Sequence, residues 1–125
     1  MKKLLFCLTI IVLTTLASCT KETTYSFTDY TDYSGLSIRE RIFWLKEYDI
    51  NGSCVSNNRL ESPVRGKAYV FTANERSELI KIYISVKFQN GSPLYSWVQQ
   101  VYYLKEGGNV DISIDGNTLV GPSEP

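Results

Sequence analysis

The strongest constraint on the fold is a strict alternation of apolar and polar side chains between residues 80 and 88. The apolar positions are Ile80, Ile82, Ile84, Val86 and Phe88, and the positions between them are Lys81, Tyr83, Ser85 and Lys87. Successive side chains of a β-strand point to opposite faces, so this period of two collects the apolar residues on one face. A helix would scatter them around its surface. The segment therefore predicts a half-buried strand of an antiparallel sheet.

Shorter segments repeat this signal at regular intervals. We expect strands at residues 67–72, 94–104, 110–114 and 118–120, separated by turns rich in Gly, Asn and Asp. Within 94–104, Trp97, Gln99, Val101 and Tyr103 would share one face. Residues 57–66 are polar, include Pro63 and predict a loop.

Residues 37–50 are compatible with two interpretations. The run Ser37-Ile38-Arg39-Glu40 matches a capping box, which would begin a helix. The strand interpretation is favoured, because bulky residues from Ile42 to Trp44 precede Asn51-Gly52, a strong hairpin turn signal. We therefore expect a strand from about residue 41 to residue 50. Ile42, Trp44 and Lys46 would lie on one face of this strand, and Phe43, Leu45 and Glu47 on the other.

These elements predict an all-β fold, a small antiparallel two-sheet sandwich of immunoglobulin-like architecture with six to seven strands. A small β-barrel is the alternative. The domain is expected to span 37–121, with 122–125 as a frayed tail. The expected core comprises Ile42, Leu45, Val70, Ile80, Ile82, Ile84, Val86, Val101, Ile112 and Ile114.

The first residues have the layout of a secretory leader. Lys2 and Lys3 precede an almost wholly apolar run from residue 4 to 16, which is too short to span a bilayer and suits a signal peptide. The run ends in Leu16-Ala17-Ser18-Cys19, which resembles the lipobox of bacterial lipoproteins. The resemblance implies cleavage after a signal peptide of residues 1–18. It also implies that acyl chains such as palmitate are attached at Cys19 as a membrane anchor.

The residues after the lipobox bear on localisation. Residues 19–36 are rich in Thr, Ser, Tyr and Asp, so we expect a lipidated N-terminus and tether, with an edge strand near 24–28 as an option. Thr20 stands where lipoproteins retained at the inner membrane of Gram-negative bacteria tend to carry Asp. The resemblance therefore implies the outer membrane of the cell envelope and leaves surface exposure open.

Composition narrows the chemistry. Without the leader, 107 residues remain, enough for one domain, and 11 basic residues face 13 acidic ones, which argues against nucleic-acid binding. The chain has no histidine, which excludes His-based nucleophilic systems and His-ligated zinc. Cys54 is the one cysteine beyond Cys19, and we expect it buried on a strand. No cofactor and no metal site are expected.

One group of residues is a candidate binding surface: Tyr83, Trp97, Gln99 and Tyr103. Presented outward from neighbouring strands, they would form an aromatic and amide surface able to stack on sugar rings or to receive a peptide. Packing of these aromatic rings inside the sandwich is the competing and favoured interpretation. Asp111 and Asp115 would lie about 13 Å apart on one strand, wider than paired glycosidase carboxylates.

The sequence therefore favours a membrane-anchored, non-enzymatic binding or interaction lipoprotein of the bacterial envelope, with an envelope protein or a glycan as partner. A small envelope inhibitor of a hydrolase, inserting residues 57–63 into an active site, is the alternative. A carboxylate-only hydrolase is the third hypothesis. It ranks last because the acidic residues do not cluster in the sequence.

Overall fold

The computed structural model describes residues 21–125, so the leader and Cys19 lie outside the described residues. The described chain contains nine strands and no helix. The strands are β1 (Thr24–Asp29), β2 (Ile38–Tyr48), β3 (Cys54–Glu61), β4 (Ala68–Thr72), β5 (Leu79–Phe88), β6 (Pro93–Val98), β7 (Tyr102–Tyr103), β8 (Asn109–Ile114) and β9 (Val120–Gly121).

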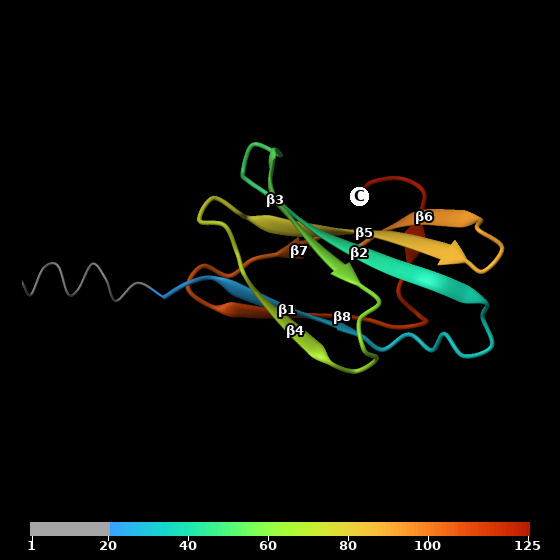
Figure 1. The fold of residues 1–125 in the computed structure, drawn as a ribbon. Coiled ribbons are helices and arrows are strands. Elements are labelled where there is room, and N and C mark those ends of the chain that lie inside the picture. The colour runs from blue at the N-terminus through green and yellow to red at the C-terminus, as the bar shows by residue number, and fades with distance from the viewer. Residues whose placement is uncertain (1–20) are drawn as a thin grey trace, which may run out of the picture.

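The strands form two separate sheets that pack as layers (Figure 1). The small sheet has the order β4-β1-β8, and the large sheet has the order β3-β2-β5-β6-β9, with β7 also paired to β5. All pairs are antiparallel except β1 with β8. The all-β two-sheet sandwich predicted from the sequence is confirmed, but with nine strands in the described residues and not the expected six to seven. The small-barrel alternative is wrong because the sheets do not join.

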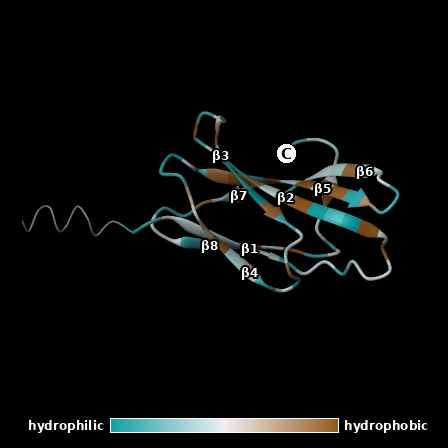
Figure 2. Cartoon of the chain, viewed as in Figure 1, coloured by the Kyte–Doolittle hydropathy of each residue, from teal (hydrophilic) through white to brown (hydrophobic). Residues whose placement is uncertain are grey.

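The centre of the large sheet follows the sequence prediction. The strand interpretation of residues 37–50 is correct, since β2 pairs along its length with β5. The turn after β2 is closed by Asp49, whose carboxylate accepts hydrogen bonds from the backbone N–H groups of Asn51 and Ser53. Figure 2 shows hydrophilic and hydrophobic segments alternating along these long strands. One face of β2 and β5 is therefore inward, and the other faces solvent.

The core lies between the two sheets and joins them through aromatic rings. Phe27 of β1 and Phe43 of β2 are fully buried, and their ring centroids are 5.1 Å apart. The predicted core residues confirmed in this cluster are Leu45, Ile80, Ile82, Ile84, Ile112 and Ile114, with Val86 packed against it. Ile42 is buried outside the cluster, and Val101 is partly buried outside it. Val70 was expected inside but is 68% exposed, because its neighbour Phe71 takes the inward position opposite Tyr25.

The domain begins earlier in the chain than the tether prediction allowed. Residues 24–29 form the central strand of the small sheet, paired on both sides, and not an edge strand or a spacer. Tyr25 and Phe27 point inward and are fully buried. Ser26 lies between them and is also buried, and its hydroxyl donates a hydrogen bond to Asp111 on β8. Residues 24–29 are therefore integral to the fold.

Three further segments differ from expectation. Residues 57–61 belong to edge strand β3 rather than to a loop, which shortens the loop to the residues after Glu61. The tail of 122–125 is held and not frayed, because Glu124 accepts hydrogen bonds from Tyr48 and Lys81. Residues 94–104 divide into β6 and β7, since residues 99–101 leave the ladder.

A fully buried carboxylate ties several elements together. Glu47 of β2 points between the sheets, and its Oε2 accepts hydrogen bonds from the Tyr25 hydroxyl at 3.0 Å and the Asn58 amide at 2.9 Å. Its Oε1 accepts from the Asn74 backbone N–H at 2.7 Å and the Ser77 hydroxyl at 2.6 Å. Four donors from three other parts of the chain thus compensate the cost of burying the charge.

This network predicts that the protein loses stability in alkaline solution. Burial, reinforced by the neighbouring Glu47 carboxylate, raises the pKa of Tyr25 above its usual 10.0. A phenol whose folded pKa is raised contributes stability that is complete below pH 10.0 and is lost as the pH rises further. We expect the free energy of unfolding to fall by up to about 1.4 kcal/mol per pH unit from this group. Urea unfolding between pH 8 and pH 11 measures it. The free energy of unfolding should fall less steeply with pH in Tyr25→Phe than in the unmodified protein. An equal pH dependence in both proteins would contradict the role given to Tyr25.

Candidate binding surface

The solvent-facing side of the large sheet carries a continuous row of residues in register across five strands. Arg59 of β3 pairs with Trp44 of β2, Trp44 with Tyr83 of β5, Tyr83 with Trp97 of β6, and Trp97 with Gly121 of β9. Directly paired residues point to the same face, and neighbouring strands are about 4.8 Å apart. The three aromatic side chains therefore span about 10 Å across the middle of the sheet. We call Trp44, Tyr83 and Trp97 the aromatic row.

Contacts between the rings fix this row. The Tyr83 ring lies 4.8 Å from the Trp97 ring, centroid to centroid, and 6.1 Å from the ring of Tyr95, to which it is nearly parallel. Trp44, Tyr83 and Trp97 are partly buried, while Tyr95 is 54% exposed. Since aromatic rings pack favourably in tilted and stacked arrangements, the row is a preformed surface and not a set of free side chains.

A shallow groove of about 370 Å³ runs beside the row. Its lining residues are Trp44, Lys46, Asn57, Tyr83, Ser85 and Tyr95, drawn from β2, β3, β5 and β6. The groove thus crosses strands on the face of the sheet. It combines ring faces with one ammonium group, one amide group, the Ser85 hydroxyl and two phenolic hydroxyl groups.

Charged side chains and the C-terminal tail border the surface. The Arg59 guanidinium lies 5.7 Å from the centre of the Trp44 ring and is paired with Glu61 at 3.1 Å. Where the C-terminal tail meets this face, the Lys81 ammonium pairs with the Glu124 carboxylate at 3.3 Å. The hydrogen bond from Tyr48, followed by that from Lys81, lowers the pKa of the Glu124 carboxyl, so it is charged at neutral pH. The tail therefore covers the end of this face near Tyr48.

The structure brings together only part of the residue set proposed from the sequence. Tyr83 and Trp97 are direct cross-strand partners. Gln99 lies beside them but has a structural contact, since its amide donates hydrogen bonds to the backbone oxygens of Trp97 and Ser123. Tyr103 is 71% exposed on β7, opposite Leu79, about 13 Å along β5 from Tyr83.

Five residues of the row and its groove were missed by the sequence analysis: Trp44, Lys46, Asn57, Ser85 and Tyr95. A signal for the first two was present, because the strand interpretation already placed Trp44 and Lys46 together on one face of residues 41–50. What was lacking was the register that sets Trp44 opposite Tyr83. Such pairings join distant parts of the sequence, so a single strand pattern does not contain them.

Other residues singled out in the sequence have local structural contacts. Asp111 accepts hydrogen bonds from Ser26 and Asn109, and Asp115 accepts from the backbone N–H of Asn117 in the turn before β9. The Ser26 and Asn109 hydrogen bonds lower the pKa of Asp111. Cys54 was expected to be buried but is exposed, because it opens edge strand β3 directly after the turn. Residues 21–125 contain no group of three or more metal-ligating side chains.

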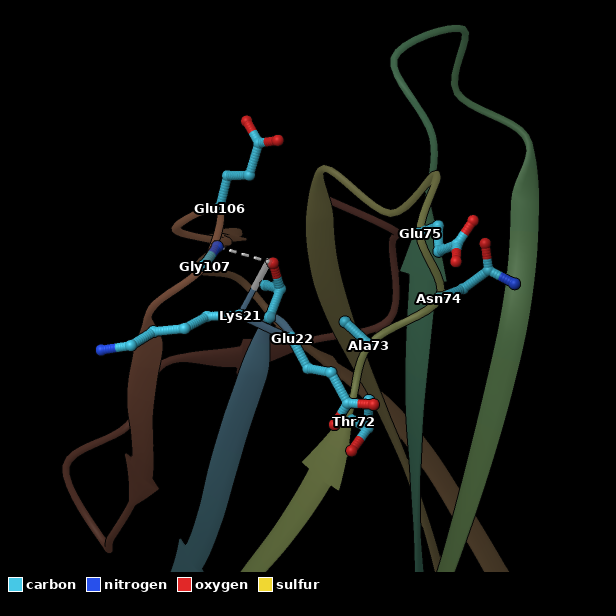
Figure 3. A pocket seen from close by; sticks show the side chains of 9 residues that line it. Lys21, Glu22, Thr72, Ala73, Asn74, Glu75, Glu106 and Gly107 are labelled. Atoms are coloured by element: carbon cyan, nitrogen blue, oxygen red, sulfur yellow. Dashed lines mark hydrogen bonds between the residues drawn. The ribbon is translucent and has the colours of Figure 1, made fainter. Parts of the chain in front are cut away.

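A larger hollow of about 590 Å³ lies where the described chain begins (Figure 3). It is lined by Lys21, Glu22, Thr23, Thr72, Ala73, Asn74, Glu75, Glu106 and Gly107. Figure 3 shows Glu75 and Glu106 on opposite sides of it, and the Gly107 N–H donates a hydrogen bond to Thr23. No aromatic side chain lines this hollow. It therefore lacks the flat apolar surface that the aromatic row offers a ligand.

Comparison of the chain with protein-family models, with curated proteins and with solved structures finds no match. Within the described residues, no helix has the length and apolar character needed to cross a membrane.

Proposed function

We propose that this protein is a membrane-anchored, non-enzymatic binding module of the bacterial envelope, and that the aromatic row receives a saccharide. The observation that carries the proposal is the alignment of Trp44, Tyr83 and Trp97 across three strands on the solvent side of the large sheet. Both tryptophans of the chain lie in this row.

The chemistry of the surface suits a sugar. The C–H faces of a pyranose ring are apolar and pack on aromatic ring faces, while its hydroxyl groups need hydrogen-bonding partners at the rim. Asn57 and Ser85 line the groove, and neither side chain is hydrogen-bonded to another of the described residues. Flat aromatic surface with a few polar groups is the usual composition of small-ligand sites.

A peptide is a poorer fit for the same surface. Extended peptides bind sheets at an edge, where unpaired backbone N–H and C=O groups add a strand. The groove instead lies over β2 and β5, whose backbones are already paired on both sides. A peptide there would leave most of its own backbone groups without partners, and this costs free energy.

The anchor part of the proposal rests on the lipobox resemblance and has a direct test. When the full chain is expressed in a bacterial host, Cys19→Ser should move the protein from the membrane fraction to the soluble envelope fraction. Acyl chains provide the membrane affinity, about 0.8 kcal/mol per buried CH₂ group, and they cannot attach to serine through a thioether. Fractionation with immunoblotting measures the change. An unchanged membrane fraction for Cys19→Ser would contradict the anchor.

The binding part is tested by removing one ring of the row. Trp97→Ala should weaken binding of the full chain to immobilised envelope polysaccharide by about tenfold or more, since a central aromatic anchor contributes ~2 kcal/mol. Tyr103→Ala removes an exposed aromatic ring of the same sheet outside the row and should leave binding unchanged. Thermal unfolding of both variants checks that the domain is intact. Loss of binding in Tyr103→Ala with retention in Trp97→Ala would refute the assignment of the row.

A further inference from the structure

The groove beside the aromatic row is lined by a single positively charged side chain. Lys46 is its one charged lining residue. Its cationic neighbours on the same face are neutralised, Arg59 by Glu61 and Lys81 by Glu124. Within residues 21–125, no carboxylate lies within salt-bridge distance of Lys46. The groove therefore presents beside the rings one ammonium group that has no direct salt-bridge partner, although the Glu124 carboxylate interacts with it at longer range.

The position of Lys46 matters as much as its charge. It neighbours the row, two residues from Trp44 along β2, and it pairs with Asn57 on one side and Lys81 on the other. Its Nζ lies 5.8 Å from the centre of the Trp97 ring. A sugar ring stacked on the row would thus have its edge within reach of the ammonium. Asn57 would lie next to the same edge.

A partly buried ammonium is best matched by an anionic group of the ligand. In a groove lined by rings and partly shielded from water, an unpaired charge gains more from an opposite charge than it would in bulk solvent. A neutral saccharide would leave the Lys46 ammonium partly desolvated and without a carboxylate in direct contact. The groove is therefore better matched to an acidic sugar than to a neutral one.

We infer that the ligand is an acidic saccharide, whose ring stacks on the aromatic row and whose carboxylate pairs with the Lys46 ammonium. This inference rests on the proposed saccharide-binding function and adds the chemical class of the sugar. In this arrangement the rings of Trp44, Tyr83 and Trp97 contact the apolar face of the sugar. The Lys46 ammonium binds the carboxylate of the sugar, and Asn57 and Ser85 hydrogen-bond to its hydroxyl groups.

The test uses the full chain, purified in detergent, on an immobilised panel of uronic-acid and sialic-acid oligosaccharides. Each acidic sugar is placed beside its carboxyl-reduced counterpart, which keeps the ring and removes the charge. At least one acidic member should bind, and its reduced counterpart should bind about tenfold more weakly. Binding of the acidic member should also weaken as salt is raised from 50 to 500 mM, values chosen to bring the Debye length from about 14 Å to about 4 Å.

Variants locate the charge recognition. Lys46→Gln should reduce binding of the acidic sugar to about the level of its reduced counterpart and leave the latter unchanged. Lys87→Gln is the matched control, because it removes an exposed lysine from the same face of β5 outside the groove. It should bind as the unmodified protein does. Thermal unfolding confirms that both variants are folded.

The failures of the two proposals are distinguishable. Equal binding of acidic and reduced sugars that is lost in Trp97→Ala would overturn the acidic-sugar inference and retain the saccharide-binding function. Failure of every acidic member to bind would overturn the inference. Binding of acidic peptides but of no sugar would overturn it together with the saccharide-binding function.

Discussion

Replacement of Glu47 by alanine is expected to destabilise the domain by on the order of 3 kcal/mol. The change removes the acceptor of four hydrogen bonds. It leaves the donors on Tyr25, Asn74 and Ser77 without their partner and the Asn58 amide with only the Tyr25 hydroxyl. Buried donors left unpaired cost about 1–3 kcal/mol each, and the terms are not additive because the groups share one carboxylate. The midpoint of urea unfolding and its slope give the change.

Two further variants sharpen this test. Glu78→Ala removes an exposed glutamate that makes no side-chain hydrogen bond to the described residues, and should change the free energy of unfolding by less than about 0.5 kcal/mol. Glu47→Gln keeps the shape and one carbonyl oxygen, so its effect should fall between the two alanine variants. Equal midpoints for Glu47→Ala and Glu78→Ala would show that the buried carboxylate has no structural role.

Phe27→Ala is expected to have an effect of similar or larger size, about 3–5 kcal/mol. Phe27 is fully buried, and its ring contacts Phe43 of the opposite sheet, so its removal leaves a cavity between the layers. Domains of this size are stable by only about 5–15 kcal/mol, and this variant is expected to be partly unfolded near 37 °C. Circular dichroism during thermal unfolding measures the loss.

Tyr30→Ala is the control for this prediction. Tyr30 follows β1 directly and is 51% exposed, so its removal should be nearly neutral. If Phe27→Ala is as stable as Tyr30→Ala, residues 24–29 would be a spacer outside the core. That result would restore the tether interpretation of the sequence.

The parts of the fold that the sequence predicted are those in which one strand carries its own pattern. Residues 80–88 alternate without exception, and β5 is the strand with two full neighbours at the centre of the large sheet. The strand at residues 38–48 was also predicted, because bulky side chains and a hairpin turn favour the same outcome. In both segments, local preference and tertiary packing agree.

The errors arose where polar residues are buried or where a strand lies at an edge. In β1, Ser26 and Thr28 are covered by the neighbouring strands β4 and β8, so a composition typical of a tether conceals a central strand. In β3, one side is unpaired and faces solvent, and Asn58 turns inward to bind the buried Glu47. Polar composition alone therefore does not distinguish a loop from a strand of this kind.

The candidate site could be predicted only in part for a related reason. Tyr83 and Trp97 were grouped correctly because their segments were expected to be neighbouring strands of a hairpin. Trp44 joins them through the pairing of β2 with β5, which are separated by two strands in the sequence. Tyr103 lies away from Tyr83 and Trp97, because residues 99–101 interrupt the long strand that was expected.

The central claim is that the ligand binds on the aromatic row, and the indole N–H signals test it most directly. The two tryptophans of the chain are Trp44 and Trp97, so a ¹⁵N-labelled sample gives two indole resonances, both from the row. Titration with fragments of envelope polysaccharide should shift both resonances and leave the backbone amides of β1 and β4 in place. Shifts confined to the hollow between Lys21 and Gly107, with both indole signals unmoved, would contradict the account.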